Sequence, residues 1–130
     1  MGNNPISWIS KKQSVVATST AEAEYISASV CIKKLLRIKN ILYELFKFNK
    51  PLTLFTDNNA SKISMENGEL NPKLKHISIK YHFNKDNIEK NLIKLKYIST
   101  DKMLADTLTK CVNGTKMTTF ANQIFITNEN

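Results

Sequence analysis

Residues 19 to 46 carry the strongest structural signal in the chain. Ser19 and Glu22 have the spacing of a capping box, in which a hydroxyl followed three residues later by a carboxylate marks the start of a helix. Apolar or small side chains then recur every three or four positions, the period of one helix face. These side chains are Tyr25, Ala28, Ile32, Leu35, Ile38, Leu42 and Leu45. We expect a helix that starts after Ser19, runs to about Phe46 and ends before Pro51.

Shorter elements are expected on both sides of this helix. β-Branched or alternating segments predict strands, which are Ile6–Ile9, Val15–Thr18, Leu52–Thr56 and Leu92–Ile98. Helical segments are predicted near Ala60–Met65, over Tyr81–Lys90, and from a cap at Ser99–Asp101 through Leu108. The pattern of Ile77–Tyr81 fits either a strand or a helix. Strands that alternate with helices predict an α/β fold, with a mostly parallel sheet covered by helices.

The composition is that of a folded domain. The chain has 130 residues, of which 42% are apolar, and it has three glycines and three prolines. It lacks an apolar run of the roughly 18 residues that a membrane span requires. Residues 1–5 show neither the basic start nor the apolar stretch of a secretory signal. Cys31 and Cys111 match no metal-binding spacing, which favours a reducing, intracellular setting with both thiols free.

The charge balance favours a polyanionic partner. Nineteen basic residues against eleven acidic ones give a formal net charge of +8. An excess of this size points to nucleic acid before a membrane surface. All but one of the basic residues are Lys, and Asn and Ile are also abundant, so A/T-rich codon usage is an alternative source of part of this charge.

Three carboxylates stand at positions suited to metal chemistry. Glu24 lies early in the long predicted helix, Asp57 follows a predicted strand, and Asp106 lies within an apolar helical segment. Carboxylates that converge are commonly bridged by Mg²⁺ or Mn²⁺, and two such ions can activate water for phosphodiester hydrolysis. Each acid also has a structural interpretation. Glu24 can be a solvated acid favoured by the helix dipole, Asp57 a helix cap or Asx-turn residue, and Asp106 a partner of Lys102 or Lys110.

Several motifs, in order, resemble the ribonuclease H region of copia-type retrotransposon Pol polyproteins. The motifs are ISWISKKQ from Ile6, VATSTAEAEY from Val16, TDN from Thr56, KHISIKYHF from Lys75, YIST from Tyr97 and LADTLTK from Leu104. The resemblance implies a partial ribonuclease H-like domain over residues 1–110, followed by a C-terminal extension over 111–130. In the extension, only Phe120–Ile126 has an amphipathic pattern.

The resemblance also implies a fold and an activity. The family has a five-stranded mixed sheet with helices on both sides, and it cleaves the RNA strand of RNA–DNA hybrids with four acids and two Mg²⁺ ions. Glu24, Asp57 and Asp106 match three of these acids. The family's first aspartate lies on a central opening strand before the Ser7-Trp8 segment, and no acid precedes Ile6 here. We therefore expect a ribonuclease H-like fragment without the opening strand, an incomplete two-metal site and little or no activity.

The expected partners follow from this resemblance. They are an RNA–DNA hybrid or other nucleic acid, together with the reverse transcriptase portion of the polyprotein or a missing N-terminal strand. The expected location is the cytoplasm, within virus-like particles, or the nucleus. Candidate nucleic-acid contacts are Asn58, Lys75, His76, Lys80, Tyr81 and His82. A solvated basic helix is the alternative for the lysine–histidine cluster. A non-catalytic basic binding fragment and a non-functional transposon relic are the alternatives for the whole chain.

Overall fold

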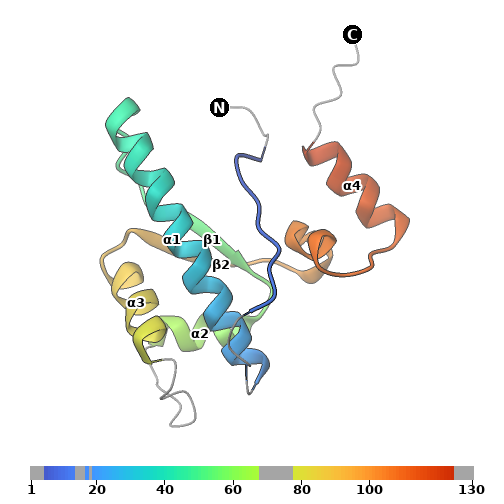
Figure 1. Ribbon diagram of the computed structural model, residues 1–130, viewed down its shortest axis with the longest axis horizontal. Coiled ribbons are helices and arrows are strands. Elements are labelled where there is room, and N and C mark those ends of the chain that lie inside the picture. The colour runs from blue at the N-terminus through green and yellow to red at the C-terminus, as the bar shows by residue number, and fades with distance from the viewer. Residues whose placement is uncertain (1–4, 14–16, 18, 68–77, 125–130) are drawn as a thin grey trace. The chain divides into compact units, whose positions relative to one another are not determined.

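A computed structural model of the chain describes residues 5–13, 17, 19–67 and 78–124 (Figure 1). The chain divides into two compact units. The central unit comprises residues 13–98, and the terminal unit comprises residues 1–12 and 99–130. Each unit is described by itself below.

The long helix of the central unit forms where the sequence predicts it. Helix α1 spans Thr20–Phe46, and the Ser19 hydroxyl at its N-cap accepts a hydrogen bond of 3.2 Å from the Glu22 N–H. At its other end, Lys47 adopts a left-handed conformation with φ of 53°, and its N–H reaches the carbonyls of Leu42 and Tyr43. The predicted start and end of this helix are confirmed.

Two strands and two helices complete the central unit. Strand β1 (Leu52–Thr56) pairs in parallel with strand β2 (Ile93–Tyr97), and Leu54 lies opposite Leu95. Helices α2 (Asn59–Asn67) and α3 (Ser78–Glu89) lie between the strands in sequence, as a parallel pair requires. The α/β class is confirmed. The described residues hold two paired strands, and the five-stranded sheet implied by the resemblance is not seen among them.

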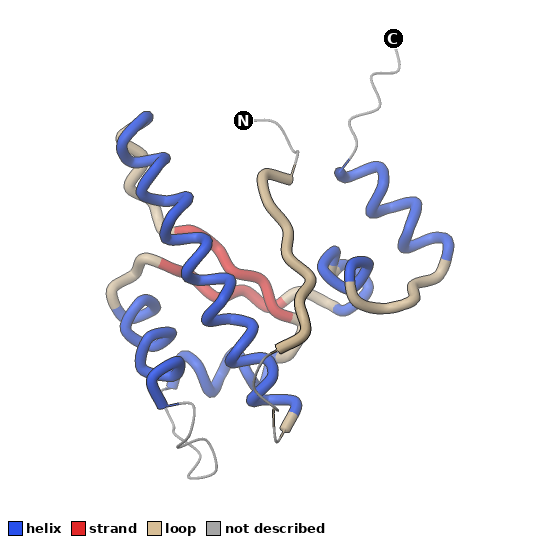
Figure 2. Tube along the Cα trace, in the orientation of Figure 1, coloured by secondary structure: helices blue, strands red, loops and turns tan. Residues whose placement is uncertain are grey.

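The core of the central unit lies between helix α1 and one face of the sheet. Figure 2 shows α1 crossing the two strands, with α2 and α3 beside it. The buried side chains come from all of these helices and from β2: Tyr25, Ile26, Ala28, Met65, Tyr81 and Leu95. Tyr25 and Tyr81 lie with their ring centroids 5.8 Å apart. The tilted ring pair joins α1 to α3, and burial of its apolar surface favours folding.

A buried amide adds a polar link between the same two helices. Asn84 on α3 is fully buried. Its Oδ1 accepts a hydrogen bond of 2.9 Å from the Ser29 hydroxyl, and its Nδ2 donates one of 3.2 Å to the Tyr25 carbonyl. Because an unpaired amide would be costly in the core, these bonds fix how α3 is placed along α1.

The terminal unit differs from the predictions for its segments. Residues 6–9 form no strand, and Ile6 and Trp8 are 75% and 70% exposed. A strand needs a neighbour for its backbone N–H and C=O groups, and no described strand pairs with this segment. The prediction of a strand at Ile6–Ile9 is therefore wrong.

Of the predicted strand Val15–Thr18, which belongs to the central unit, only Ala17 is described, and it lies in a loop. The predicted loop at Gly68–Pro72 lies outside the described residues.

The predicted last helix is replaced by two short 3₁₀ turns. They span Thr100–Lys102 and Leu104–Leu108. Met103 separates them with an extended ψ of 102°, and Ser99 makes no side-chain capping bond, so a continuous α-helix cannot form here. Helix α4 (Gly114–Ile124) follows. Its start is capped by Asn113, whose side chain accepts a hydrogen bond of 2.9 Å from the Lys116 N–H.

Replacing Asn84 tests the polar link in the core. We expect Asn84→Ala to destabilise the chain by about 1–3 kcal/mol, because it removes two buried hydrogen bonds, to the Ser29 hydroxyl and the Tyr25 carbonyl, and leaves Ser29 only its longer contact of 3.4 Å with the Lys80 carbonyl. Chemical denaturation followed by circular dichroism measures this loss. Asn40→Ala is the matched control, since Asn40 is exposed on α1, and it should leave stability unchanged or slightly raised. Equal stability of the two variants would contradict the assigned role of Asn84.

Candidate functional site

Two of the predicted metal-binding acids come from elements that meet in the central unit. Glu24 lies in the second turn of α1, and Asp57 directly follows the carboxyl end of β1. The neighbouring Tyr25 hydroxyl donates a hydrogen bond of 3.1 Å to Ser64 on α2, the helix that begins just after Asp57. The second turn of α1 therefore contacts α2, the helix that follows β1 in the chain. Both acids are half-buried. In α/β sheets, ligands collect at this end of the strands.

The residue that caps α2 is Asn58, so the alternative interpretation of Asp57 as the cap of this helix is wrong. Asn58 caps α2: its Oδ1 accepts a hydrogen bond of 2.9 Å from the Ser61 N–H, and its carbonyl accepts one of 3.0 Å from Lys62. The Asn58 N–H donates to the Thr56 hydroxyl at 3.2 Å. Asn58 thus has a clear structural function, and its predicted contact with nucleic acid stays a prediction.

Asp106, the third predicted acid, lies in the terminal unit and is paired with two lysines. Its side chain is 10% exposed. One carboxylate oxygen lies 2.8 Å from Lys110 Nζ, and the other lies 3.0 Å from Lys116 Nζ on α4. Lys116 also donates a hydrogen bond to the Thr100 carbonyl. The pair with Lys110 confirms one of the two alternatives for Asp106, whereas the contact with Lys116 was not predicted.

These ion pairs decide how well Asp106 suits a metal. Hydrogen bonds from Lys110 and then Lys116 hold the pKa of the Asp106 carboxyl below its usual value, although burial opposes this shift. The carboxylate is therefore ionised, as a metal ligand must be, but both of its oxygens already face ammonium groups. Mg²⁺ prefers oxygen ligands such as carboxylates, so the side chains of Glu24 and Asp57 have the right chemistry to bind it. Asp106 fits it only after the lysines move away.

No cluster of three or more His, Cys, Asp or Glu side chains is arranged to hold a metal within the described residues. Glu24 and Asp57 together supply two carboxylates. Their binding of a metal stays a prediction.

The predicted nucleic-acid contacts differ in how much of each side chain is exposed to solvent. Tyr81 is a core residue with only 1% of its surface exposed, so its ring presents no face to a ligand. His82 is exposed, with its ring nearly perpendicular to the Tyr81 ring, and Lys80 is half-buried. Lys75 and His76 lie outside the described residues. Only part of the predicted cluster is therefore available on the described surface of α3.

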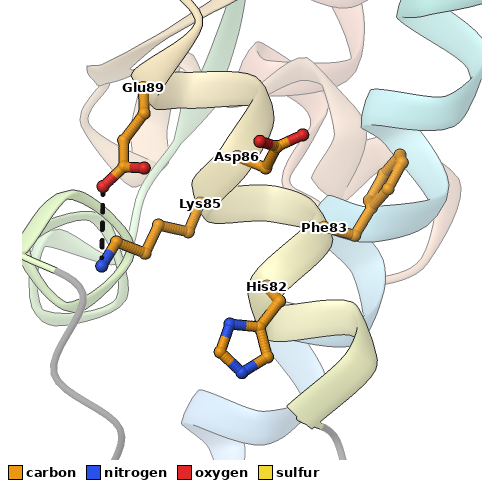
Figure 3. Close-up of a pocket in the computed structure, with 5 residues that line it drawn as sticks. All are labelled: His82, Phe83, Lys85, Asp86 and Glu89. Carbon is orange, nitrogen blue, oxygen red and sulfur yellow. Dashed lines mark ion pairs between the residues drawn. The ribbon is translucent and has the colours of Figure 1, made fainter.

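An open pocket is lined by side chains of α3 (Figure 3). Its lining residues are His82, Phe83, Lys85, Asp86 and Glu89. Lys85 and Glu89 form an ion pair of 3.5 Å across one turn, drawn as a dashed line in the figure. Neither Glu24 nor Asp57 contributes to this pocket. The pocket is therefore separate from the candidate metal ligands.

Two further findings concern the cysteine thiols and the possibility of a membrane-spanning helix. Cys31 and Cys111 are both free, as predicted. Burial raises the pKa of the Cys31 thiol, which favours its protonated, less reactive form. Among the described helices, none combines the length and apolar character needed to cross a bilayer.

Comparison with known proteins finds similarity to retrovirus-related Pol polyproteins of plant transposons. The chain is 35% identical over 98% of its length to the Pol polyprotein from transposon RE1 of Arabidopsis thaliana. It is 34% identical over 95% of its length to that from transposon RE2 of the same plant, and 36% identical over 85% to that from transposon TNT 1-94 of Nicotiana tabacum. The chain spans only 8–9% of these relatives. No family model and no solved structure matches.

Replacing Lys116 tests the ion pairs of Asp106. We expect Lys116→Met to raise the pKa of Asp106 toward its ordinary value of 3.8, because one of the two ammonium groups is lost. A carboxyl whose pKa is lowered by folding stabilises the folded state above its unfolded pKa, and this contribution disappears as the pH falls through the folded-state pKa. The variant should therefore lose about 1 kcal/mol at neutral pH and progressively less below pH 3.8.

Titration of the Asp106 carboxyl carbon by nuclear magnetic resonance measures the pKa, and denaturation at several pH values measures the stability. Lys62→Met is the matched control, since it breaks the ion pair between Lys62 and Glu66 on α2. An unchanged Asp106 pKa in Lys116→Met would show that α4 does not hold this carboxylate in solution.

Proposed function

We propose that this chain is a segment of a transposon Pol polyprotein and contributes to a ribonuclease H-type site. Such a site hydrolyses the RNA strand of an RNA–DNA hybrid with the help of Mg²⁺ or Mn²⁺. The observation that carries the proposal is the placement of Glu24 and Asp57, which come from the start of α1 and the carboxyl end of β1 in one packed unit. The motifs around both acids and the similarity to Pol polyproteins support it.

The residues of this chain would have distinct tasks in the reaction. Glu24 and Asp57 would hold metal ions, and Asp106 would be a further metal ligand, as the resemblance implies, once released from Lys110 and Lys116. The bound ions would polarise the scissile phosphate and lower the pKa of the attacking water. Both carboxylates are half-buried, one on a helix and one directly after a strand, and such rigid elements would position them for a metal ion. No side chain of this set acts as a covalent nucleophile.

The isolated chain is expected to be nearly inactive. Both carboxylate oxygens of Asp106 are occupied by lysines, and the resemblance implies a fourth acid beyond the three matched here. We propose that the rest of the Pol polyprotein, including its reverse transcriptase portion, supplies what the site lacks. The reaction would take place where reverse transcription occurs, in cytoplasmic particles or in the nucleus.

A binding module without catalysis is the second candidate, and the net charge of +8 favours it. Such a module would hold hybrid or duplex RNA through phosphate contacts, and its affinity would fall linearly with salt on logarithmic scales. Asp57→Asn would leave its binding intact or tighten it. The two candidates therefore differ in whether hydrolysis depends on the acids.

Hybrid cleavage tests the proposal directly. The purified chain, alone and fused to the Pol segment that precedes it in the polyprotein, is incubated with a labelled RNA–DNA hybrid and Mg²⁺ or Mn²⁺. We expect little or no cleavage by the chain alone and clear cleavage by the fusion. Glu24→Gln and Asp57→Asn should each lower the rate of the fusion at least about 100-fold, because each removes a charged metal ligand.

Asp86→Asn is the control for these variants, since Asp86 is an exposed acid on α3 that pairs with Lys90. It should keep the full rate. Cleavage that survives both Glu24→Gln and Asp57→Asn would contradict the site assignment. Cleavage by the chain alone that is lost in Asp57→Asn would show that the chain is an enzyme by itself.

A further inference from the structure

One face of the two-stranded sheet in the central unit is not covered by the helices of that unit. Side chains alternate between the two faces of a strand. Leu54 and Leu95 point to the core, where they pack with the buried cluster. The other face carries Thr53 and Phe55 from β1 and Lys94 and Lys96 from β2. We call these four residues the open face.

The strand register places these residues next to one another. Thr53 lies opposite Lys94, and Phe55 lies opposite Lys96. Phe55 is 50% exposed, and both lysines are exposed. Parallel strands are normally covered on both faces. The open face thus combines a half-exposed aromatic ring with a lysine directly opposite it and a second lysine two residues before that one on β2.

The charge on the open face is not neutralised within the described residues. Lys94 and Lys96 form no ion pair there, although several other lysines do. The paired lysines are Lys62, Lys85, Lys90, Lys110 and Lys116. The four positions of the open face include no acid. The face thus presents two free positive charges beside one apolar ring.

We propose that the open face binds single-stranded nucleic acid. The Phe55 ring stacks on one base, while Lys94 and Lys96 contact neighbouring phosphates of the same strand. Two residues along a β-strand are about 6.6 Å apart, a spacing similar to that of successive phosphates in an extended single strand. Only a single strand offers a free base plane, because the bases of a duplex already stack on each other. A second copy of this chain is a poor occupant, since its lysines would face these lysines.

This surface is distinct from Glu24 and Asp57, and its function does not require hydrolysis. The proposal rests on the proposed function only for the kind of partner. A binding assay without metal ions therefore distinguishes failure of this proposal from failure of the proposed ribonuclease H site.

Fluorescence anisotropy with a labelled oligouridylate measures the binding, in chelator and over a series of salt concentrations. We expect Lys94→Gln/Lys96→Gln to weaken binding at least about tenfold at low salt and to reduce the salt slope by about 1.4, as loss of two phosphate contacts predicts. Phe55→Ala should weaken binding of the oligouridylate by about tenfold and leave binding of an RNA–DNA hybrid unchanged. Circular dichroism melts confirm that the variants are folded.

Lys85→Gln/Lys90→Gln is the control, because it makes the same change in net charge at lysines that are already paired with acids. It should change the affinity less than twofold. The proposal is overturned if this control weakens binding as much as the open-face pair, or if Phe55→Ala has no effect on the oligouridylate. It is also overturned if polyglutamate binds as tightly as the oligouridylate, or if Phe55→Ala abolishes a dimer of the chain.

Discussion

The contact between Tyr25 on α1 and Tyr81 on α3 is the interaction on which the central unit depends. The two rings lie 5.8 Å apart and are almost wholly buried. Around them, the Tyr25 hydroxyl binds Ser64 on α2, and its carbonyl accepts from the buried Asn84 on α3. One residue of α1 thus joins three helices. Because Glu24 is its neighbour in sequence, the first candidate ligand belongs to the turn of α1 that these contacts hold.

The three predicted acids have different surroundings. Glu24 and Asp57 are half-buried and belong to the central unit, which offers the start of a helix and the end of a strand. Asp106 belongs to the terminal unit, where two ammonium groups compensate its charge. The burial that disfavours a carboxylate is therefore offset without a metal at Asp106. To bind a metal, as we propose, Asp106 would have to exchange its lysines for the cation.

Local signals in the sequence predict the elements that are stabilised locally. The hydroxyl of Ser19 and the period of α1 predict its bounds, and the alternation of Leu52–Thr56 predicts β1. The wrong prediction for Ile6–Ile9 has a physical cause, since a strand depends on a partner that its own residues do not specify. The split of the last helix at Met103 and the contact of Lys116 with Asp106 depend on tertiary packing. Helix α4 was missed, although Asn113 as a cap and the apolar spacing of Met117, Phe120 and Ile124 signal it.

The most direct test of the account is metal binding by the chain itself. Mn²⁺ is titrated into isotopically labelled protein, and the paramagnetic broadening of backbone amide signals is mapped by nuclear magnetic resonance. The account predicts that signals around Glu24 and Asp57 broaden first, and that Asp57→Asn removes this effect while Asp86→Asn does not. Broadening centred on other acids, or equal broadening in wild type and Asp57→Asn, would contradict the assignment of a metal site to the start of α1 and the end of β1.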